Sequence, residues 1–234
     1  MIKNFEPRLY QETILNTCST KNTLVVLPTG MGKTNVFLML ASHRLKQYPN
    51  SKILFIGPTK PLIDQYLEVF KNNFEIPENQ MSIFTGQVSP EKRQELWKTS
   101  KIIFSTPQGL ENDIISRRIN LGDVSLLGVD EAHRAVGDYA YVFVAKQYNK
   151  MARHPKILAL TASPGSDMEK IQEVCTNLFI EGIEVRTDQD PDVKPYIKEI
   201  KVDWVKVDLN PIFNEIKNYL DNYLKQRFTK LKTW

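Results

Sequence analysis

The chain has 234 residues, of which 41% are hydrophobic and 25% charged, with a formal net charge of +4. This is the composition of a globular protein large enough for one α/β domain or two small ones. The longest apolar stretch, VFLMLA, is far too short to span a bilayer, and the first residues lack a signal-peptide core, so we expect a soluble, cytoplasmic protein. The mild basicity is compatible with a polyanionic partner, although a solvated surface gives the same balance of charge. If the source is prokaryotic, we expect the protein to be associated with the nucleoid.

Short runs rich in β-branched residues alternate with longer stretches of helical periodicity, such as residues 34–45 and 61–74. Strands buried on both faces and separated by helices are typical of a mostly parallel sheet flanked by helices on both faces, an α/β fold. In such sheets, ligands bind at the carboxyl ends of the strands. The predicted strands are residues 23–27, 52–57, 81–84, 101–105, 125–130 and 156–162.

The stretch LPTGMGKT, residues 27–34, joins a predicted strand to a predicted helix and resembles a phosphate-binding loop, although Leu27 stands where the common fingerprint has Gly. Its glycines let backbone N–H groups approach an anion at a helix N-terminus. Lys33 would reach the β- and γ-phosphates and Thr34 would bind Mg²⁺. The alternative is a glycine turn with an exposed lysine. The predicted ATP-binding residues of this loop are Thr29, Gly30, Met31, Gly32, Lys33 and Thr34.

Two carboxylates follow the apolar run SLLGV. Asp130 is placed to hold Mg²⁺, and Glu131 to act as general base on the attacking water. Alone, the pair could be two solvated carboxylates at a strand end. Together with the upstream loop, they predict a catalytic set of Lys33, Asp130 and Glu131.

DEAH (residues 130–133) and PTGMGKT together resemble the superfamily 2 DEAH-type helicases, whose loop does not use the first Gly, which accounts for Leu27. Within that family, DEAHRAVGDYAYVFVAKQY, LTASPG and DVKPYIKEI are most similar to the branch of archaeal Hef and Fanconi anaemia M. The resemblance covers residues 1 to about 187. It implies a RecA-like first lobe, ATP and Mg²⁺ as cofactors, and forked or branched DNA as substrate.

The resemblance also implies residue roles. PRLYQ suggests that Gln11 reads the adenine edge with Arg8 in support, and LTASPG suggests that Thr161 and Ser163 couple nucleotide state to DNA through His133. Hydroxyls, amides and cations that follow three of the predicted β-strands would hold the phosphate backbone of the nucleic acid. Threonines at such positions also favour helix capping and turns. These predicted nucleic-acid contacts are Thr59, Lys60, Thr85, Gly86, Thr106 and Gln108.

Two basic pairs, Lys92–Arg93 and Arg117–Arg118, are further candidates for electrostatic grip, a solvated face being the simpler interpretation. Cys18 and Cys175 show no metal-type spacing, which predicts packed thiols in a reducing compartment.

The pattern changes near Asp188. We predict that residues 1–187 form the ATP-binding lobe and that 188–234 form a boundary strand over 197–209 and the beginning of a helical insertion from Pro211. The second RecA-like lobe of such motors, with its arginines, is absent, so we expect more protein beyond Trp234 and weak or no turnover by this chain.

The predicted function is therefore the first lobe of an ATP-dependent DNA helicase or translocase in replication fork repair, with the second lobe, and a replication clamp as a further candidate, as partners. Three alternatives stay open: a nucleotide-gated nucleic-acid-binding module without turnover, an RNA helicase of the Dicer-like branch, and a P-loop kinase. The kinase would not explain DEAH, TASPG and STPQG together.

Overall fold

The computed structural model describes residues 2–3, 5–163, 165, 167–196, 204–207 and 210–232. The chain divides into two compact units, residues 1–197 and 198–234, which are described separately. The predicted boundary at residue 187 lies ten residues before this division. Among the described residues, none of the helices combines the length and apolar character needed to cross a membrane.

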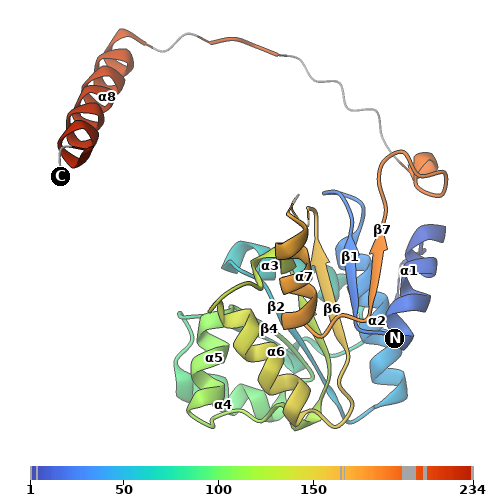
Figure 1. Cartoon of the computed structure of the whole chain (residues 1–234). Helices are drawn as coiled ribbons and strands as arrows, with labels where there is room; N and C mark the ends of the chain where they lie inside the picture. Colours follow the sequence, from blue (N-terminus) through green and yellow to red (C-terminus); the bar gives the residue numbers. More distant parts are fainter. Residues whose placement is uncertain are drawn as a thin grey trace. The chain divides into compact units, whose positions relative to one another are not determined.

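The first unit is built on a seven-stranded sheet in which every strand pairing is parallel (Figure 1). The six predicted strands are confirmed. The edge strand β7 escaped prediction because its residues alternate between half-buried and exposed, which gives no apolar run. In spatial order the strands are β3 (Met81–Phe84), β4 (Ile102–Ser105), β2 (Lys52–Ile56), β5 (Val124–Val129), β6 (Ile157–Thr161), β1 (Thr23–Val26) and β7 (Gly182–Val185).

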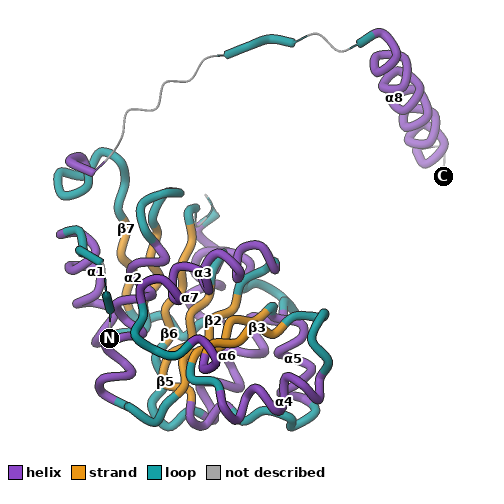
Figure 2. Tube along the Cα trace, turned by 180° about the vertical axis from the view of Figure 1, so that it is seen from behind, coloured by secondary structure: helices purple, strands orange, loops and turns teal. Residues whose placement is uncertain are grey.

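Helices cover both faces of the sheet, which confirms the predicted RecA-like α/β layering (Figures 1 and 2). One face carries α1 (Leu9–Thr20), α2 (Lys33–Gln47) and α3 (Lys60–Asn73). The opposite face carries α4 (Pro90–Thr99), α5 (Pro107–Ile115), α6 (Ala140–Met151) and α7 (Met168–Asn177).

The alternation of side chains along each strand divides the core in two. In β2, Ile53 and Phe55 pack into the core under α1–α3, whereas Leu54 and Ile56 pack into the core under α4–α7. Each of these side chains is fully buried. Strands that are apolar at every position therefore have a helical layer to cover each face, which is why the sequence reads as continuous apolar runs.

Aromatic rings fill the first of these cores. The rings of Phe37 and Phe55 lie 4.7 Å apart between centroids, and Tyr66 lies 4.0 Å from Phe55. Gly128 of β5 lies beneath this cluster, and a Cβ there would come within 2.6 Å of both Phe37 and Phe55. The close packing of α2 against β5 and β2 therefore requires glycine at this position.

In the second unit, α8 (Pro211–Lys232) is an amphipathic helix whose predicted apolar positions, including Ile212, Ile216, Leu220 and Leu224, are exposed. The predicted strand over 197–209 lies mostly outside the described residues, and the described part, 204–207, forms no strand.

Gly128→Ala should destabilise the chain by about 1–3 kcal/mol, because packed rings must move to admit the methyl group. Gly109→Ala is the matched control: it lies in helix α5, its Cβ would meet nothing closer than 3.8 Å, and alanine is the better helix former. Urea denaturation of the three proteins measures the difference. A Gly128→Ala variant as stable as wild type would contradict the packing described here.

Candidate nucleotide site and nucleic-acid interface

Three adjacent parallel strands, β5, β6 and β1, have their carboxyl ends side by side. Val26 of β1 lies opposite Thr161 of β6, and Val129 of β5 lies opposite Ala159. The amide of Leu27 continues the ladder by donating to the carbonyl of Thr161 at 3.1 Å. The loop after β1, the carboxylates after β5 and the segment after β6 therefore meet at the carboxyl ends, where open parallel sheets bind ligands.

The loop after β1 has the backbone of a phosphate cradle. Gly30 and Gly32 have φ values of +83° and +77°, a region that side chains rarely adopt. Gly32 is also the N-cap of α2, and a Cβ there would lie 2.4 Å from Nε2 of Gln11. The loop thus requires glycine for both conformation and space, and it leads into the N-terminus of a 15-residue helix.

Lys33 is the first residue of α2 and its ammonium folds over the loop. Its Nζ donates to the carbonyl of Leu27 at 2.9 Å and reaches that of Pro28 at 3.5 Å. Burial lowers the pKa of Lys33, while the charges of Asp130 and Glu131 act in the opposite direction. The lysine is therefore half-buried beside two carboxylates, and phosphate oxygens are stronger acceptors than the carbonyls it now contacts.

Asp130 is 3% exposed, and its carboxylate is the clearest sign of a binding site. Its main chain is fixed, because its N–H donates to Ile56 and its carbonyl accepts from the Tyr141 hydroxyl at 2.9 Å each. Among the described residues, its Oδ1 has no hydrogen-bond partner. Burial raises the pKa of Asp130 to about 6, against the lowering effect of the Glu131 amide and Lys33. A buried carboxylate oxygen without a hydrogen bond is costly, and a cation would satisfy it.

The residues present fit Mg²⁺ bound with a nucleotide. Within the described part of the chain, no group of three or more His, Cys, Asp or Glu residues is placed to hold a metal by itself. Mg²⁺ is commonly held by one or two carboxylates together with substrate phosphates and water. Asp130 and Thr34 would supply the protein's share of that set.

Glu131 begins a chain of polar contacts that crosses to β6. Glu131 has φ +49°, a left-handed conformation that is uncommon outside glycine and costs backbone strain. Its Oε2 lies 3.3 Å from Nδ1 of His133, and that nitrogen lies 3.1 Å from Oγ1 of Thr161. The Thr161 hydroxyl in turn donates to the carbonyl of Ser163 at 2.9 Å. The three predicted coupling residues are therefore joined to the predicted general base, and a proton on Nδ1 satisfies both contacts of the histidine.

The predicted adenine-sensing residues lie against the loop. Gln11 is fully buried, its Oε1 accepts from the amide of Arg8 at 3.1 Å, and its Nε2 lies 3.5 Å from the carbonyl of Met31. Sequence analysis missed Tyr10, whose hydroxyl donates to the same Met31 carbonyl at 2.7 Å and accepts from Arg8 at 3.0 Å. Adenine recognition by Gln11 and Arg8 stays a prediction.

The predicted nucleic-acid contacts follow β2, β4 and β3, which are neighbours in the sheet. Thr59 and Thr106 are the N-caps of α3 and α5, and Thr59 and Gln108 are exposed. Lys60 is exposed and pairs with Asp64 at 3.0 Å. Parallel strands thus bring these positions to one edge, beside the loops of the nucleotide site.

The turn after β3 separates the last two predicted contacts. Thr85 is 5% exposed and its hydroxyl accepts from the amide of Gln87 at 3.3 Å, so its side chain shapes the turn. Gly86 is exposed and open. If this turn contacts a nucleic-acid strand as predicted, the contact is made by its backbone.

A buried ion pair fixes this turn against α5. Arg93 of α4 donates to both carboxylate oxygens of Asp113 at 2.5 and 2.9 Å, and also to the carbonyls of Thr85 and Val88. Arg93 is 5% exposed and Asp113 is fully buried. The interpretation of Arg93 as part of a solvated face or a DNA grip is therefore wrong: the guanidinium binds the protein's own backbone. The STPQGLEND stretch contained the signal, an acidic residue at an otherwise apolar helical position.

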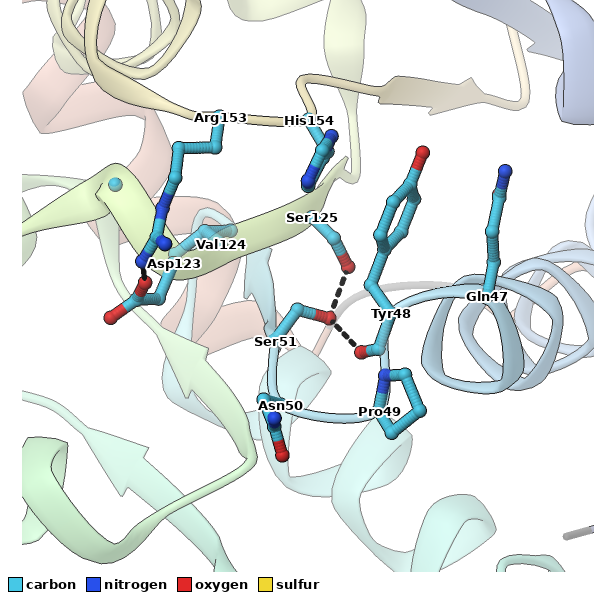
Figure 3. Close-up of a pocket in the computed structure, with 11 residues that line it drawn as sticks. Gln47, Tyr48, Pro49, Asn50, Ser51, Asp123, Val124, Ser125, Arg153 and His154 are labelled. Atoms are coloured by element: carbon cyan, nitrogen blue, oxygen red, sulfur yellow. Dashed lines mark hydrogen bonds and ion pairs between the residues drawn. The ribbon is translucent and has the colours of Figure 1, made fainter.

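A cavity of about 240 Å³ lies at the opposite end of the sheet, between the segments 47–51, 122–125 and 153–154 (Figure 3). Its polar groups bond to one another: Ser51 to Ser125 at 2.7 Å, and Arg153 to Asp123. The cavity is thus remote from the loops that carry the predicted site.

The sequence was compared with models of known protein families. Residues 8–171 match the model of the DEAD/DEAH box helicases. The chain belongs to the DEAD/DEAH box helicase family. The matched segment runs from Arg8 to Ile171 and so includes the glycine loop after β1, the DEAH residues and the predicted coupling residues.

Relatives of this chain include members of the predicted branch, that of Hef and Fanconi anaemia M. The helicase domain of Hef from Pyrococcus furiosus matches with a TM-score of 0.81 and 49% identity, covering 94% of this chain and 47% of that one. The Fanconi anemia group M protein homolog of Mus musculus is 38% identical over 218 residues. A Methanocaldococcus jannaschii protein named "Putative ATP-dependent RNA helicase" is 43% identical over 230 residues. These two alignments include 93% and 98% of this chain, but only 11% and 29% of the length of the relatives.

Asp130→Asn should change how stability depends on pH. Burial raises the folded-state pKa to about 6 from an ordinary 3.8, so protonated Asp130 favours the folded state below about pH 4, and this contribution is lost as pH rises through 6. Asparagine does not titrate, so without nucleotide the variant should gain about 2–3 kcal/mol relative to wild type between pH 4 and 8. Urea denaturation across this range measures it, and Asp138→Asn controls for the removed charge. A constant difference would contradict the buried, unpaired carboxylate.

Arg93→Ala should destabilise the chain by about 3–5 kcal/mol, because the buried charge of Asp113 would keep only Arg118, 3.9 Å away, as a basic partner. Lys92→Ala, at the adjacent exposed position, should stay within about 0.5 kcal/mol of wild type. Equal effects in thermal or urea unfolding would restore the solvated-face interpretation. If Arg93→Ala weakened DNA binding while stability stayed unchanged, the DNA-grip interpretation would return.

Proposed function

We propose that this chain is the ATP-binding first lobe of a DNA helicase or translocase that acts on forked or branched DNA in replication fork repair. The observation that supports it best is the unpaired Oδ1 of buried Asp130, which lies at a strand end beside the Lys33 ammonium and a loop of left-handed glycines. These are the elements needed to bind a metal-chelated triphosphate.

In this proposal, backbone N–H groups of the loop and the N-terminus of α2 hold the β-phosphate, and Lys33 leaves its carbonyl contacts to bind β- and γ-oxygens. Thr34 and Asp130 would hold Mg²⁺, which would neutralise charge on the phosphates. Glu131 accepts a proton from the attacking water, with His133 orienting its carboxylate.

Coupling to the nucleic acid runs through the polar chain from Glu131 to Thr161. Since His133 contacts both the general base and a fully buried hydroxyl on β6, a change at the γ-phosphate alters the hydrogen bonds of the segment after that strand. A two-lobed motor needs such a link between nucleotide state and grip on the strand.

DNA is the preferred substrate because relatives named ATP-dependent DNA helicases, from Neurospora crassa, Drosophila melanogaster and Saccharomyces cerevisiae, are 36–38% identical to this chain. The competing substrate is RNA: one archaeal relative is named an RNA helicase, and contacts to the phosphate backbone hardly distinguish the two. Binding of a forked DNA against an RNA of the same sequence and shape would decide between them.

The chain spans less than a third of the first curated relatives, so complete motor activity is proposed only for a longer protein. A second RecA-like lobe would supply arginines to the transition state, an effect worth about 10³–10⁵ in rate in comparable NTPases. No observation on the described residues or in the comparisons supports a replication clamp as partner. We place the protein inside the cell, where its proposed substrate is found. A nucleotide-gated binding module without turnover describes the chain alone equally well.

Lys33→Ala should weaken binding of ATP–Mg²⁺ at least ~10-fold, because it removes a charge-assisted contact to the phosphates. Lys46→Ala, at the exposed far end of the same helix, should bind as wild type does. Calorimetric titration measures both. ADP formation should be at least ~10³-fold slower than in a two-lobed motor, with or without forked DNA.

Two outcomes would overturn parts of this proposal. Undiminished ATP binding by Lys33→Ala would remove the loop from the nucleotide site. Rapid, fork-stimulated turnover by wild type would show that the second lobe's arginines are dispensable or come from a second copy of the chain.

A further inference from the structure

The DVKPY stretch, residues 192–196, has no part in the motor described above, yet it is firmly built into the first unit. Val193 is 1% exposed and lies in the same core as Tyr10 and Met31. The amides of Val193 and Lys194 both donate to the carbonyl of Asp190 at 2.9 Å. These contacts make it an ordered turn that packs beside the phosphate loop.

Ion pairs hold this turn to the sheet edge and to α1. Arg186 pairs with Asp192 at 3.0 Å and with Glu184 of β7 at 3.1 Å. The other carboxylate oxygen of Glu184 accepts from the Thr17 hydroxyl at 2.6 Å. Because Arg186 and Glu184 are each less than a fifth exposed, water screens these pairs less than surface ones.

Tyr196, the last residue of the turn, lies on the adenine-sensing element. The guanidinium carbon of Arg8 is 5.1 Å from its ring centroid, and the Tyr10 ring meets it edge-on at 5.9 Å. Arg8 donates to the Tyr10 hydroxyl, which donates to the Met31 carbonyl of the loop. Three successive contacts therefore link Tyr196 to the phosphate loop, while 41% of the residue stays exposed.

We propose that Tyr196 is a base-contacting residue of the ATP site, where adenine stacks against the pair that its ring forms with the overlying guanidinium of Arg8. The inference rests on the proposed function and extends it to the segment that leaves this lobe. An aromatic ring and a guanidinium plane are the two protein surfaces on which a base stacks best, and this pair lies on the side of the loop where Gln11 is predicted to read adenine.

The test compares ATP with inorganic tripolyphosphate, which has the phosphates but no base. Both are titrated with Mg²⁺ into the 234-residue chain, into Tyr196→Ala and into Tyr196→Phe, with Tyr219→Ala as control because that tyrosine is 79% exposed on α8. Tyr196→Ala should weaken ATP binding about 10-fold and leave tripolyphosphate binding unchanged. Tyr196→Phe and Tyr219→Ala should bind both as wild type does.

A second measurement needs no variant. ATP, but not tripolyphosphate, should slow hydrogen exchange of the Tyr196 amide, which donates to the carbonyl of Val193 at 2.9 Å. Equal losses for both ligands in Tyr196→Ala would make Tyr196 a support of the loop and overturn the inference, as would unchanged ATP affinity. A wild-type chain that binds neither ligand would overturn the proposed function and this inference with it.

Discussion

The structure depends on a buried carboxylate, Asp130, one of whose oxygens has no hydrogen-bond partner among the described residues. Asp130 is held at the end of β5 by the Ile56 carbonyl and the Tyr141 hydroxyl, both of which act on its main chain and leave Oδ1 unpaired among the described residues. Burial of this kind destabilises the fold when the group is ionised. The positive charge of Lys33 acts against this cost by lowering the pKa of Asp130, and the two charges together would suit the proposed ligand, an anion that brings its own cation.

The surrounding loops obtain their precision from the sheet. Because β6 lies between β5 and β1, the ladder fixes the spacing of Asp130, Thr161 and the phosphate loop before any ligand binds. A site preorganised in this way loses little entropy on binding. The backbone of Glu131 is strained, because its φ is positive, and its carboxylate lies beside His133. Strained backbone of this kind is common at functional sites.

The sequence sufficed for whatever depends on local pattern: six of the seven strands, the phosphate loop, and the placement of Asp130 and Glu131 at a strand end. It failed where the deciding contact joins distant segments. Nothing local marks Gly182–Val185 as a strand, because pairing with β1 is what makes it one. Arg93 reads as a surface charge until Asp113, twenty residues away, is packed against it. Tyr10 has a role only because its hydroxyl meets a loop twenty-one residues further on.

The order of the strands also separates the two predicted sites along the carboxyl ends of the sheet. β1, β6 and β5 end in the loops of the nucleotide site, whereas β2, β4 and β3 end in the predicted contacts to a strand. The two groups meet where β5 pairs with β2, and there the amide of Asp130 donates directly to Ile56, three residues before Thr59. A hydrogen bond thus joins the backbone of the proposed metal ligand directly to the end of β2. In the proposed lobe, this backbone contact would join the nucleotide site to the predicted nucleic-acid contacts, in addition to the polar chain from Glu131 to Thr161.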